Sequence, residues 1–85
     1  MLNLEFSNQS KKFLKKCDKN LRKRILDKIK LLRNNPVPHK SVSIVDEDNT
    51  FRIRIGDYRA TYEIKWDKKE ILIAKVDKRP RAYKK

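Results

Sequence analysis

The sequence predicts an α+β fold, in which an N-terminal strand and a helical hairpin pack on a twisted, mostly antiparallel sheet. Apolar residues alternate at the N-terminus, recur every three or four residues in the following segment, and alternate again through the C-terminal half. The expected order is strand, helix, helix and then four strands (β-α-α-β-β-β-β). With 85 residues, the chain has the length of one domain, and we expect a single domain at 1–85.

The first strand is expected at 2–6, where Leu and Phe alternate with polar residues. The stretch 7–10 contains Ser and Asn side chains that can cap a helix N-terminus, so a short helix should follow. Cys17 falls on the apolar side of this helix and is expected in the core. It is the only cysteine, which excludes an intramolecular disulfide and makes a structural zinc site a poor candidate.

A second, longer helix should begin after Asp18 as its cap. Its apolar residues are spaced by three and four and form one buried stripe: Leu21, Ile25, Leu26, Ile29 and Leu32. The helix should end at the Asn-Asn-Pro sequence, because Pro36 cannot continue it and Asn34 or Asn35 can close it.

The remaining residues read as strands. The segment 41–45 is a weak strand candidate, and an acidic turn follows it. Apolar and polar residues then alternate over 51–55 and again over 60–66, with Trp66 on the apolar side. The last strand, at 71–76, is apolar on both faces at its start, as is typical of a central strand.

Gly56 and Asp57 form a two-residue hairpin signal between two of these strands, because glycine adopts the positive φ that such turns require. If Ile55 and Tyr58 flank the turn, Arg54 stands directly opposite Arg59.

The charge balance indicates a polyanionic partner. The chain has 24 Lys and Arg against 11 Asp and Glu, a formal net charge of +13. Nucleic acid, an anionic membrane surface or an acidic protein would all suit it. No stretch approaches the ~18 apolar residues of a transmembrane helix, and the N-terminus lacks the features of a signal peptide. We therefore expect a cytoplasmic protein with no membrane partner.

Much of the charge lies on the predicted helices. Residues 11–40 contain twelve Lys and Arg and two acids. These cations can be a solvated face whose lysine stems cover apolar surface, or they can attract a polyanion over a distance. The sequence leaves both interpretations open.

The strand arginines are a more specific signal. Arg52 and Arg54 point to one face of their strand, and Arg59 follows on the paired strand. Like charges opposite one another are destabilising, whereas a bound phosphate would relieve the repulsion and suits the planar guanidinium. The alternative is a surface ladder that uses Glu63 or Asp57 as counterions, and the sequence does not choose between them.

The C-terminal stretch adds further cations and an aromatic ring: Lys75, Lys78, Arg79, Arg81 and Tyr83. Such a combination suits single-stranded RNA, with charges for the backbone and a ring for stacking on a base. An unstructured basic tail is the alternative, which Pro80 favours.

Three stretches, in order and spacing, resemble the RelE family of toxins from toxin–antitoxin pairs: LLRNNPVPHK, FRIRIGDYRATYEI and KVDKRPRAY. The resemblance covers nearly the whole chain, and its central stretch is the most specific part. The family fold, a helical hairpin against a twisted antiparallel sheet, agrees with the order predicted above.

The resemblance implies a toxin that acts as a ribosome-dependent endoribonuclease, cleaving mRNA in the A site without a metal or other cofactor. By motif, it implies a catalytic set of Arg52, Arg54, Arg59, Arg79 and Tyr83. The neighbouring cations expected to bind RNA are Lys75, Lys78 and Arg81. Two features depart from the family pattern. Both basic residues on the first strand of the hairpin are arginines, which do not act as general bases, and Pro80 interrupts the basic C-terminal stretch. His39 is interpreted as structural or incidental.

The resemblance also implies partners: an acidic RelB-like antitoxin, the ribosome with its mRNA, and operator DNA bound only through the antitoxin complex. Two other functions remain open. One is a ParE-like toxin that inhibits DNA gyrase without cleaving RNA, and the other is a basic nucleic-acid-binding module without turnover.

Overall fold

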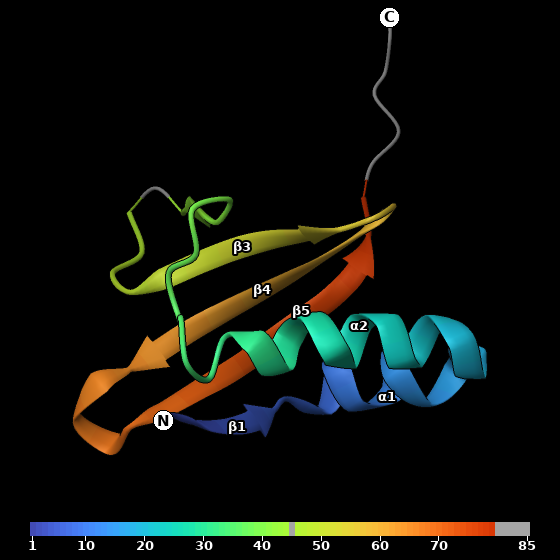
Figure 1. The fold of residues 1–85 in the computed structure, drawn as a ribbon, viewed down its shortest axis with the longest axis horizontal. Coiled ribbons are helices and arrows are strands. Elements are labelled where there is room, and N and C mark those ends of the chain that lie inside the picture. The colour runs from blue at the N-terminus through green and yellow to red at the C-terminus, as the bar shows by residue number, and fades with distance from the viewer. Residues whose placement is uncertain (45, 80–85) are drawn as a thin grey trace, which may run out of the picture.

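The computed structural model describes residues 1–44 and 46–79 (Figure 1). Its elements, in chain order, are β1 (Asn3–Phe6), α1 (Asn8–Lys16), α2 (Lys19–Leu31), β2 (Val42–Ser43), β3 (Thr50–Ile55), β4 (Tyr58–Lys65), the short 3-10 helix η1 (Trp66–Lys68) and β5 (Glu70–Lys78). This order and the α+β class confirm the prediction from the sequence.

The strands form one five-stranded sheet in the order β1-β5-β4-β3-β2. β1 pairs with β5 in parallel, and the other neighbours are antiparallel. The strand at 71–76 is therefore internal, as its apolar start predicts. β2 pairs only with Phe51 and Arg52 of β3, so the outer edge of β3 is covered over part of its length.

Both helices lie on one side of the sheet (Figure 1). The Ser7 hydroxyl caps α1 by accepting a bond of 3.1 Å from the backbone N–H of Ser10. Asp18 stands at the N-cap of α2 but makes no side-chain capping bond, unlike the sequence prediction. Arg22 instead secures the hairpin, donating to backbone carbonyls at the end of α1, including those of Leu14 at 2.8 Å and Cys17 at 2.9 Å. It thereby satisfies carbonyls that a helix end leaves unpaired.

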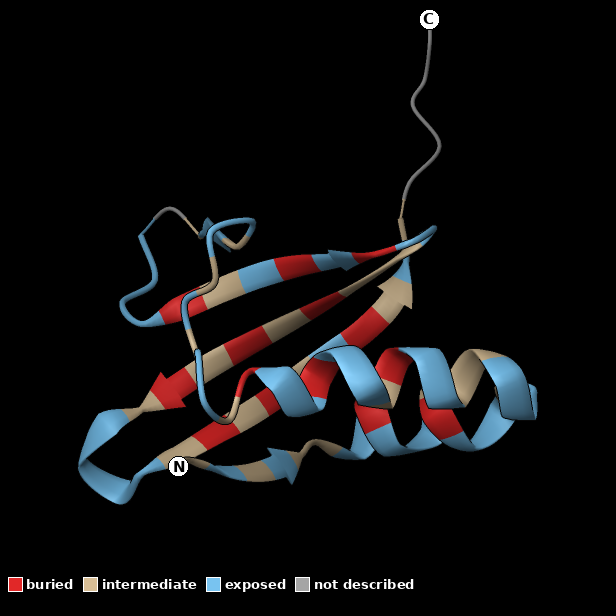
Figure 2. Cartoon of the chain, in the orientation of Figure 1, coloured by how far each residue is buried: buried red, intermediate tan, exposed pale blue. Residues whose placement is uncertain are grey.

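The core lies between the helices and the sheet (Figure 2). Ile25, Ile29 and Leu32 of the α2 stripe are fully buried, and Cys17 packs partly buried against the core. Tyr62 is the largest fully buried side chain, and its hydroxyl donates to the Pro36 carbonyl at 2.7 Å. Burial raises the pKa of Tyr62.

Trp66 corrects one sequence prediction. β4 ends at Lys65, and Trp66 begins η1 with 52% of its surface exposed instead of continuing the buried row of β4. Its indole N–H donates to the Asn49 side chain at 3.2 Å. Alternation alone does not mark the point at which a strand ends.

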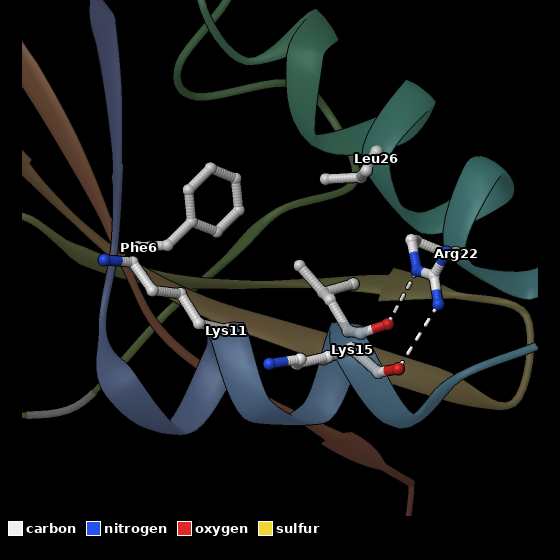
Figure 3. Close-up of a pocket in the computed structure, with 6 residues that line it drawn as sticks. Phe6, Lys11, Lys15, Arg22 and Leu26 are labelled. Carbon is white, nitrogen blue, oxygen red and sulfur yellow. Dashed lines mark hydrogen bonds between the residues drawn. The ribbon is translucent and has the colours of Figure 1, made fainter.

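An apolar surface outside the main core lies between β1 and the two helices (Figure 3). Phe6, Leu14 and Leu26 form the apolar part of a cavity of about 400 Å³, and the cations at its border are Lys11, Lys15 and Arg22. Figure 3 shows Arg22 bound to the carbonyl oxygens of Leu14 and Lys15 at the end of α1. Within the described residues, neither helix is long and apolar enough to cross a membrane.

Candidate phosphate-binding site

The β3–β4 hairpin places the strand arginines. Its turn is Gly56-Asp57, and Gly56 has a φ of 60°, as the hairpin signal predicts. Ile55 pairs with Tyr58, so Arg54 stands directly opposite Arg59. Arg52 is two residues before Arg54 and shares its face, which is the sheet face that the helices leave open.

Four of the predicted site residues line one shallow cavity on this open face: Arg52, Arg54, Arg59 and Arg79. The cavity measures about 290 Å³, and Lys40 and Val42 complete its lining. The arginines come from β3, from β4 and from the residue that follows β5, so the tertiary fold brings together cations that are up to 27 positions apart in sequence. We call these four residues the arginine cluster.

Arg79 is held by the hairpin turn. Its backbone N–H donates to the Asp57 carbonyl at 2.8 Å, and its Nη1 lies 3.4 Å from the Gly56 carbonyl oxygen. Arg54 donates to the same Gly56 oxygen from Nε at 3.3 Å. One carbonyl of the turn thus orients two guanidinium groups, which reduces their freedom before any ligand arrives.

Gly56 also lies close to the flexible end of a helix cation, which a larger residue would displace. A Cβ on Gly56 would lie 2.7 Å from Nη2 of Arg24, a cation of α2 that approaches the turn from the helix side. Gly56 is the only glycine of the chain. It combines a positive φ, which glycine adopts without strain, with the close approach of an arginine.

Arg59 is paired with a carboxylate. Its Nε and Nη2 donate to the two oxygens of Asp77 at 3.0 and 3.2 Å, and both side chains are about one quarter exposed. These hydrogen bonds raise the pKa of Arg59. The counterion is therefore neither Glu63 nor Asp57, the two candidates from the sequence. Asp77 occupies this place because it lies opposite Arg59 in the β4–β5 register.

The bidentate pair fixes the guanidinium plane but does not use all of its donors. Arginine has five N–H groups, and two of them bind Asp77. Within the described residues, Nη1 of Arg59 makes no hydrogen bond, so it is free to bind an oxyanion. The pair therefore holds the Arg59 guanidinium in a fixed orientation, in addition to partly neutralising its charge.

The other predicted residues fall into three groups. Lys75 lies beside the cluster, with its Nζ 3.8 Å from Asp77, in the cross-strand row that contains Arg52. Lys78 pairs with Tyr58 and alternates to the helix side of the sheet, away from the arginine cluster. Arg81 and Tyr83 lie outside the described residues.

Sequence reasoning missed two residues of this site, Lys40 and Asp77. Asp77 could have been found from the β4–β5 register. Lys40 could not, because it reaches the cavity through the irregular 32–41 loop, which has no periodicity to read.

A larger cavity, of about 930 Å³, adjoins the arginine cluster. It lies between the end of α2, the 32–41 loop and the outer edge of β3, and it shares Arg54 and Lys40 with the smaller cavity. His39 is among its lining residues. In the described part of the chain, no three His, Cys, Asp or Glu side chains gather into a metal-binding group.

Comparisons with known proteins agree with this architecture. The family model described as ParE toxin of type II toxin-antitoxin system, parDE, matches residues 4–83. A Methanocaldococcus jannaschii protein named "Putative toxin RelE1" is 33% identical over 96% of this chain and 94% of its own length.

Solved structures show the same fold. The RelE–RelB complex from Pyrococcus horikoshii aligns with a TM-score of 0.83 and 29% identity, covering 95% of this chain and 98% of that one. The isolated E. coli RelE toxin aligns with a TM-score of 0.85 at 18% identity, over 96% of this chain and 88% of that one, and shows the fold alone. The chain therefore belongs to the RelE family of toxins, within the RelE/ParE superfamily of type II toxin–antitoxin systems.

Proposed function

We propose that this toxin is an endoribonuclease that cleaves mRNA in the ribosomal A site and so inhibits translation in the cytoplasm. The observation that carries the proposal is the arginine cluster, in which four guanidinium groups surround one small cavity. In residues 1–44 and 46–79, Asp77 is the single carboxylate that pairs with any of them. Such a surplus of positive charge suits an anion with several negative oxygens, such as an RNA phosphate.

The reaction would use the substrate's own nucleophile. The 2′-hydroxyl oxygen of one nucleotide attacks its adjacent 3′-phosphorus in line with the 5′-oxygen of the next nucleotide. The bond to that 5′-oxygen breaks, which yields a 2′,3′-cyclic phosphate and a free 5′-hydroxyl. Arg52, Arg59 and Arg79 would stabilise the charge that accumulates on the phosphorane oxygens, while Arg54 would hold the neighbouring backbone.

The residues of this site are less suited to proton transfer than to stabilising charge on the phosphorane. Arginine stays protonated at neutral pH and does not accept the proton of the 2′-hydroxyl. The proton would therefore pass to water or to a ribosomal group, and the leaving 5′-oxygen would be protonated in the same way unless Tyr83 takes part. We consequently expect free RNA to be a poor substrate, because the ribosome would supply both orientation and proton transfer.

We infer that the physiological partner is an acidic, RelB-like antitoxin. Two structural relatives, from Pyrococcus horikoshii and from E. coli, were solved as RelE–RelB complexes, and the net charge of +13 would speed the capture of an acidic protein. The apolar cavity bordered by Lys11, Lys15 and Arg22 suits an amphipathic acidic segment (Figure 3). Operator DNA would be bound only through the antitoxin.

A ParE-like inhibitor of DNA gyrase is the second candidate, because the matching family model bears the ParE name. The arginine cluster favours the nuclease. An inhibitor that acts without cleaving RNA needs no set of cations converging on a volume of about 290 Å³.

The direct test is incubation of the purified protein with ribosomes programmed with a defined mRNA. The proposal predicts cleavage within the A-site codon and fragments that end in a 2′,3′-cyclic phosphate. Intact mRNA, combined with inhibition of gyrase supercoiling, would replace the nuclease by the second candidate. Binding of RNA without cleavage would leave only a nucleic-acid-binding module.

A further inference from the structure

We propose that the larger cavity beside the arginine cluster is a nucleobase-binding subsite, which takes the base next to the phosphate held by the arginines and so contributes to the choice of cleavage site. This inference rests on the proposed nuclease function and adds a specificity element to it. Its occupant is an RNA base, and the residues that would read the base are Asn34, Asn35 and His39.

The position of the cavity is the first argument. Arg54 and Lys40 line both cavities, so the two cavities adjoin at these side chains. A nucleotide whose phosphate lies on the arginine cluster would have its sugar and base directed onto adjoining surface. The volume of about 930 Å³ lies within the range of small-molecule sites, and is large enough for a purine.

The chemistry of the lining is the second argument. The walls are apolar, formed by Leu31, Leu32, Pro38 and Ile53. Leu31 is 66% exposed although it belongs to the regular helix α2, so the chain leaves a large apolar side chain in solvent at the mouth of this cavity. Apolar side chains of this kind can cover one face of a base, while polar groups can hydrogen-bond to its Watson–Crick and Hoogsteen edges.

The asparagines supply those polar groups, and they are not needed to end the helix. Asn34 and Asn35 stand where an asparagine commonly closes a helix by adopting positive φ. Among the described residues, those with positive φ are instead Gly56, Asp46, Asn49 and Lys69. The C-cap of α2 is Leu32, in the right-handed helical region. In residues 1–44 and 46–79, neither asparagine side chain makes a hydrogen bond. Both amides, each a donor and an acceptor, are therefore available to a base edge.

His39 and the edge of β3 complete the site. His39 is the only histidine of the chain and the only aromatic ring among the lining residues of this cavity. An imidazole can stack on a base or bind its edge. β2 leaves the outer edge of β3 from Ile53 onward without a partner strand in the part of the chain described here, and that edge adds backbone donors and acceptors.

Binding of small ligands to the full-length protein separates the base from the phosphate. We would titrate the protein with inorganic phosphate, ribose 5-phosphate and adenosine 5′-monophosphate, and follow the Arg59 guanidinium, the Asn34 and Asn35 amides and the His39 ring by NMR. All three ligands should shift Arg59, and only the nucleotide should shift Asn34, Asn35 and His39. Because base stacking contributes about 1–3 kcal/mol, the nucleotide should bind at least about fivefold more tightly than ribose 5-phosphate.

Variants make the assignment specific. His39→Ala should remove most of this fivefold advantage, and Asn34→Ala and Leu31→Ala should each reduce it, without changing the affinity for inorganic phosphate. Asn20→Ala is the matched control, since it removes an exposed amide from the other end of α2. On programmed ribosomes, the three cavity variants should redistribute cleavage among codons, whereas Asn20→Ala should reproduce the wild-type pattern.

Three outcomes would overturn the inference. Equal affinities for the nucleotide and ribose 5-phosphate, with an unmoved His39 ring, would reject the base subsite while leaving phosphate binding intact. No response of Arg59 to any ligand would reject the proposed function and the subsite together. If Leu31→Ala abolished capture of the antitoxin but left nucleotide binding unchanged, the cavity would belong to the protein partner instead.

Discussion

The two faces of strands β3 and β4 are built from alternate residues of the same segments, yet they follow opposite rules. On the helix side, Ile53, Ile55, Tyr62 and Ile64 are buried in one apolar cluster. On the open side, the same strands present Arg52, Arg54 and Arg59 around a polar cavity. Neighbouring residues of one strand therefore belong to the apolar core and to the arginine cluster in turn. Figure 2 shows the corresponding alternation of buried and more exposed residues along these strands.

The difference shows which face finds partners for its side chains within the chain itself. The core face finds its partners within the fold, including a hydrogen bond for its one buried hydroxyl, on Tyr62. The open face pairs Arg59 with Asp77, whose carboxylate also lies 3.8 Å from Lys75, and places Arg54 directly opposite Arg59. Departures from local rules are typical of functional sites, so we interpret the core face as the source of stability and the open face as the source of activity.

The largest expected effect on stability comes from the core face. Ile71 of β5 is fully buried, and Ile71→Ala should lower the free energy of unfolding by about 2–5 kcal/mol. Urea denaturation measures the change. Leu72→Ala is the matched control, because its side chain points to the open face and is only partly buried. Similar losses at the two positions would contradict the division between the faces.

The next effect concerns orientation of Arg59. Asp77→Asn should remove one charged partner and loosen the guanidinium, so we expect kcat for mRNA cleavage to fall about tenfold through misplacement. Loss of the carboxylate makes the site more positive, which should leave KM for the RNA unchanged or lower it. Separate measurement of kcat and KM on programmed ribosomes checks this, and an unchanged kcat would mean that the Arg59–Asp77 pair has no positioning role.

Tyr62 gives a smaller effect on stability with a defined pH dependence. Tyr62→Phe removes the bond to the Pro36 carbonyl and should cost about 1 kcal/mol at neutral pH. Since burial raises the pKa of Tyr62, the unfolded chain ionises first. Wild-type stability should therefore decline as the pH rises above the usual tyrosine pKa of about 10.

Unfolding curves between pH 8 and 12 test the alkaline decline. The Phe variant should show less of it than the wild type. Parallel decline in the two proteins would assign the alkaline loss to other groups.

The smallest expected effect is a gain in stability. Arg54→Gln keeps an N–H donor but removes one member of the Arg54–Arg59 pair, so stability should rise by about 0.2–1 kcal/mol at low salt. High salt or added phosphate should erase the gain, because each relieves the repulsion in the wild type. A loss of stability at low salt would show that the bond from Arg54 to the Gly56 carbonyl outweighs the repulsion.

Much of the fold follows from periodicity and turn chemistry. The α2 stripe, the Gly56-Asp57 turn and the Arg54–Arg59 register could all be predicted because each depends on local spacing. The parallel pairing of β1 with β5 and the exposure of Trp66 could not, since they depend on where distant elements meet and where a strand stops.

The residues of the candidate site also fall into those that the sequence predicts and those that it does not. Arg52, Arg54 and Arg59 follow from strand alternation. Arg79 follows from the basic C-terminal stretch, and the family resemblance adds its catalytic role. The structure places all four at one cavity. Asp77 was missed because a counterion was sought within the hairpin, whereas the partner comes from the next strand. The large cavity with Asn34, Asn35 and His39 was missed because asparagines before proline are adequately explained as helix-ending residues.

The most direct test of the central claim compares cleavage of mRNA on programmed ribosomes by the wild type, Arg59→Ala, Arg79→Ala and Lys12→Ala. Lys12 is an exposed cation of α1 outside the arginine cluster, and its variant controls for the loss of one charge. We predict that both arginine variants cleave at least about a hundredfold more slowly, which corresponds to about 2.7 kcal/mol of lost transition-state stabilisation. Lys12→Ala should stay within a few-fold of the wild type. Equal rates for all four proteins would contradict the assignment of the open face to RNA phosphate.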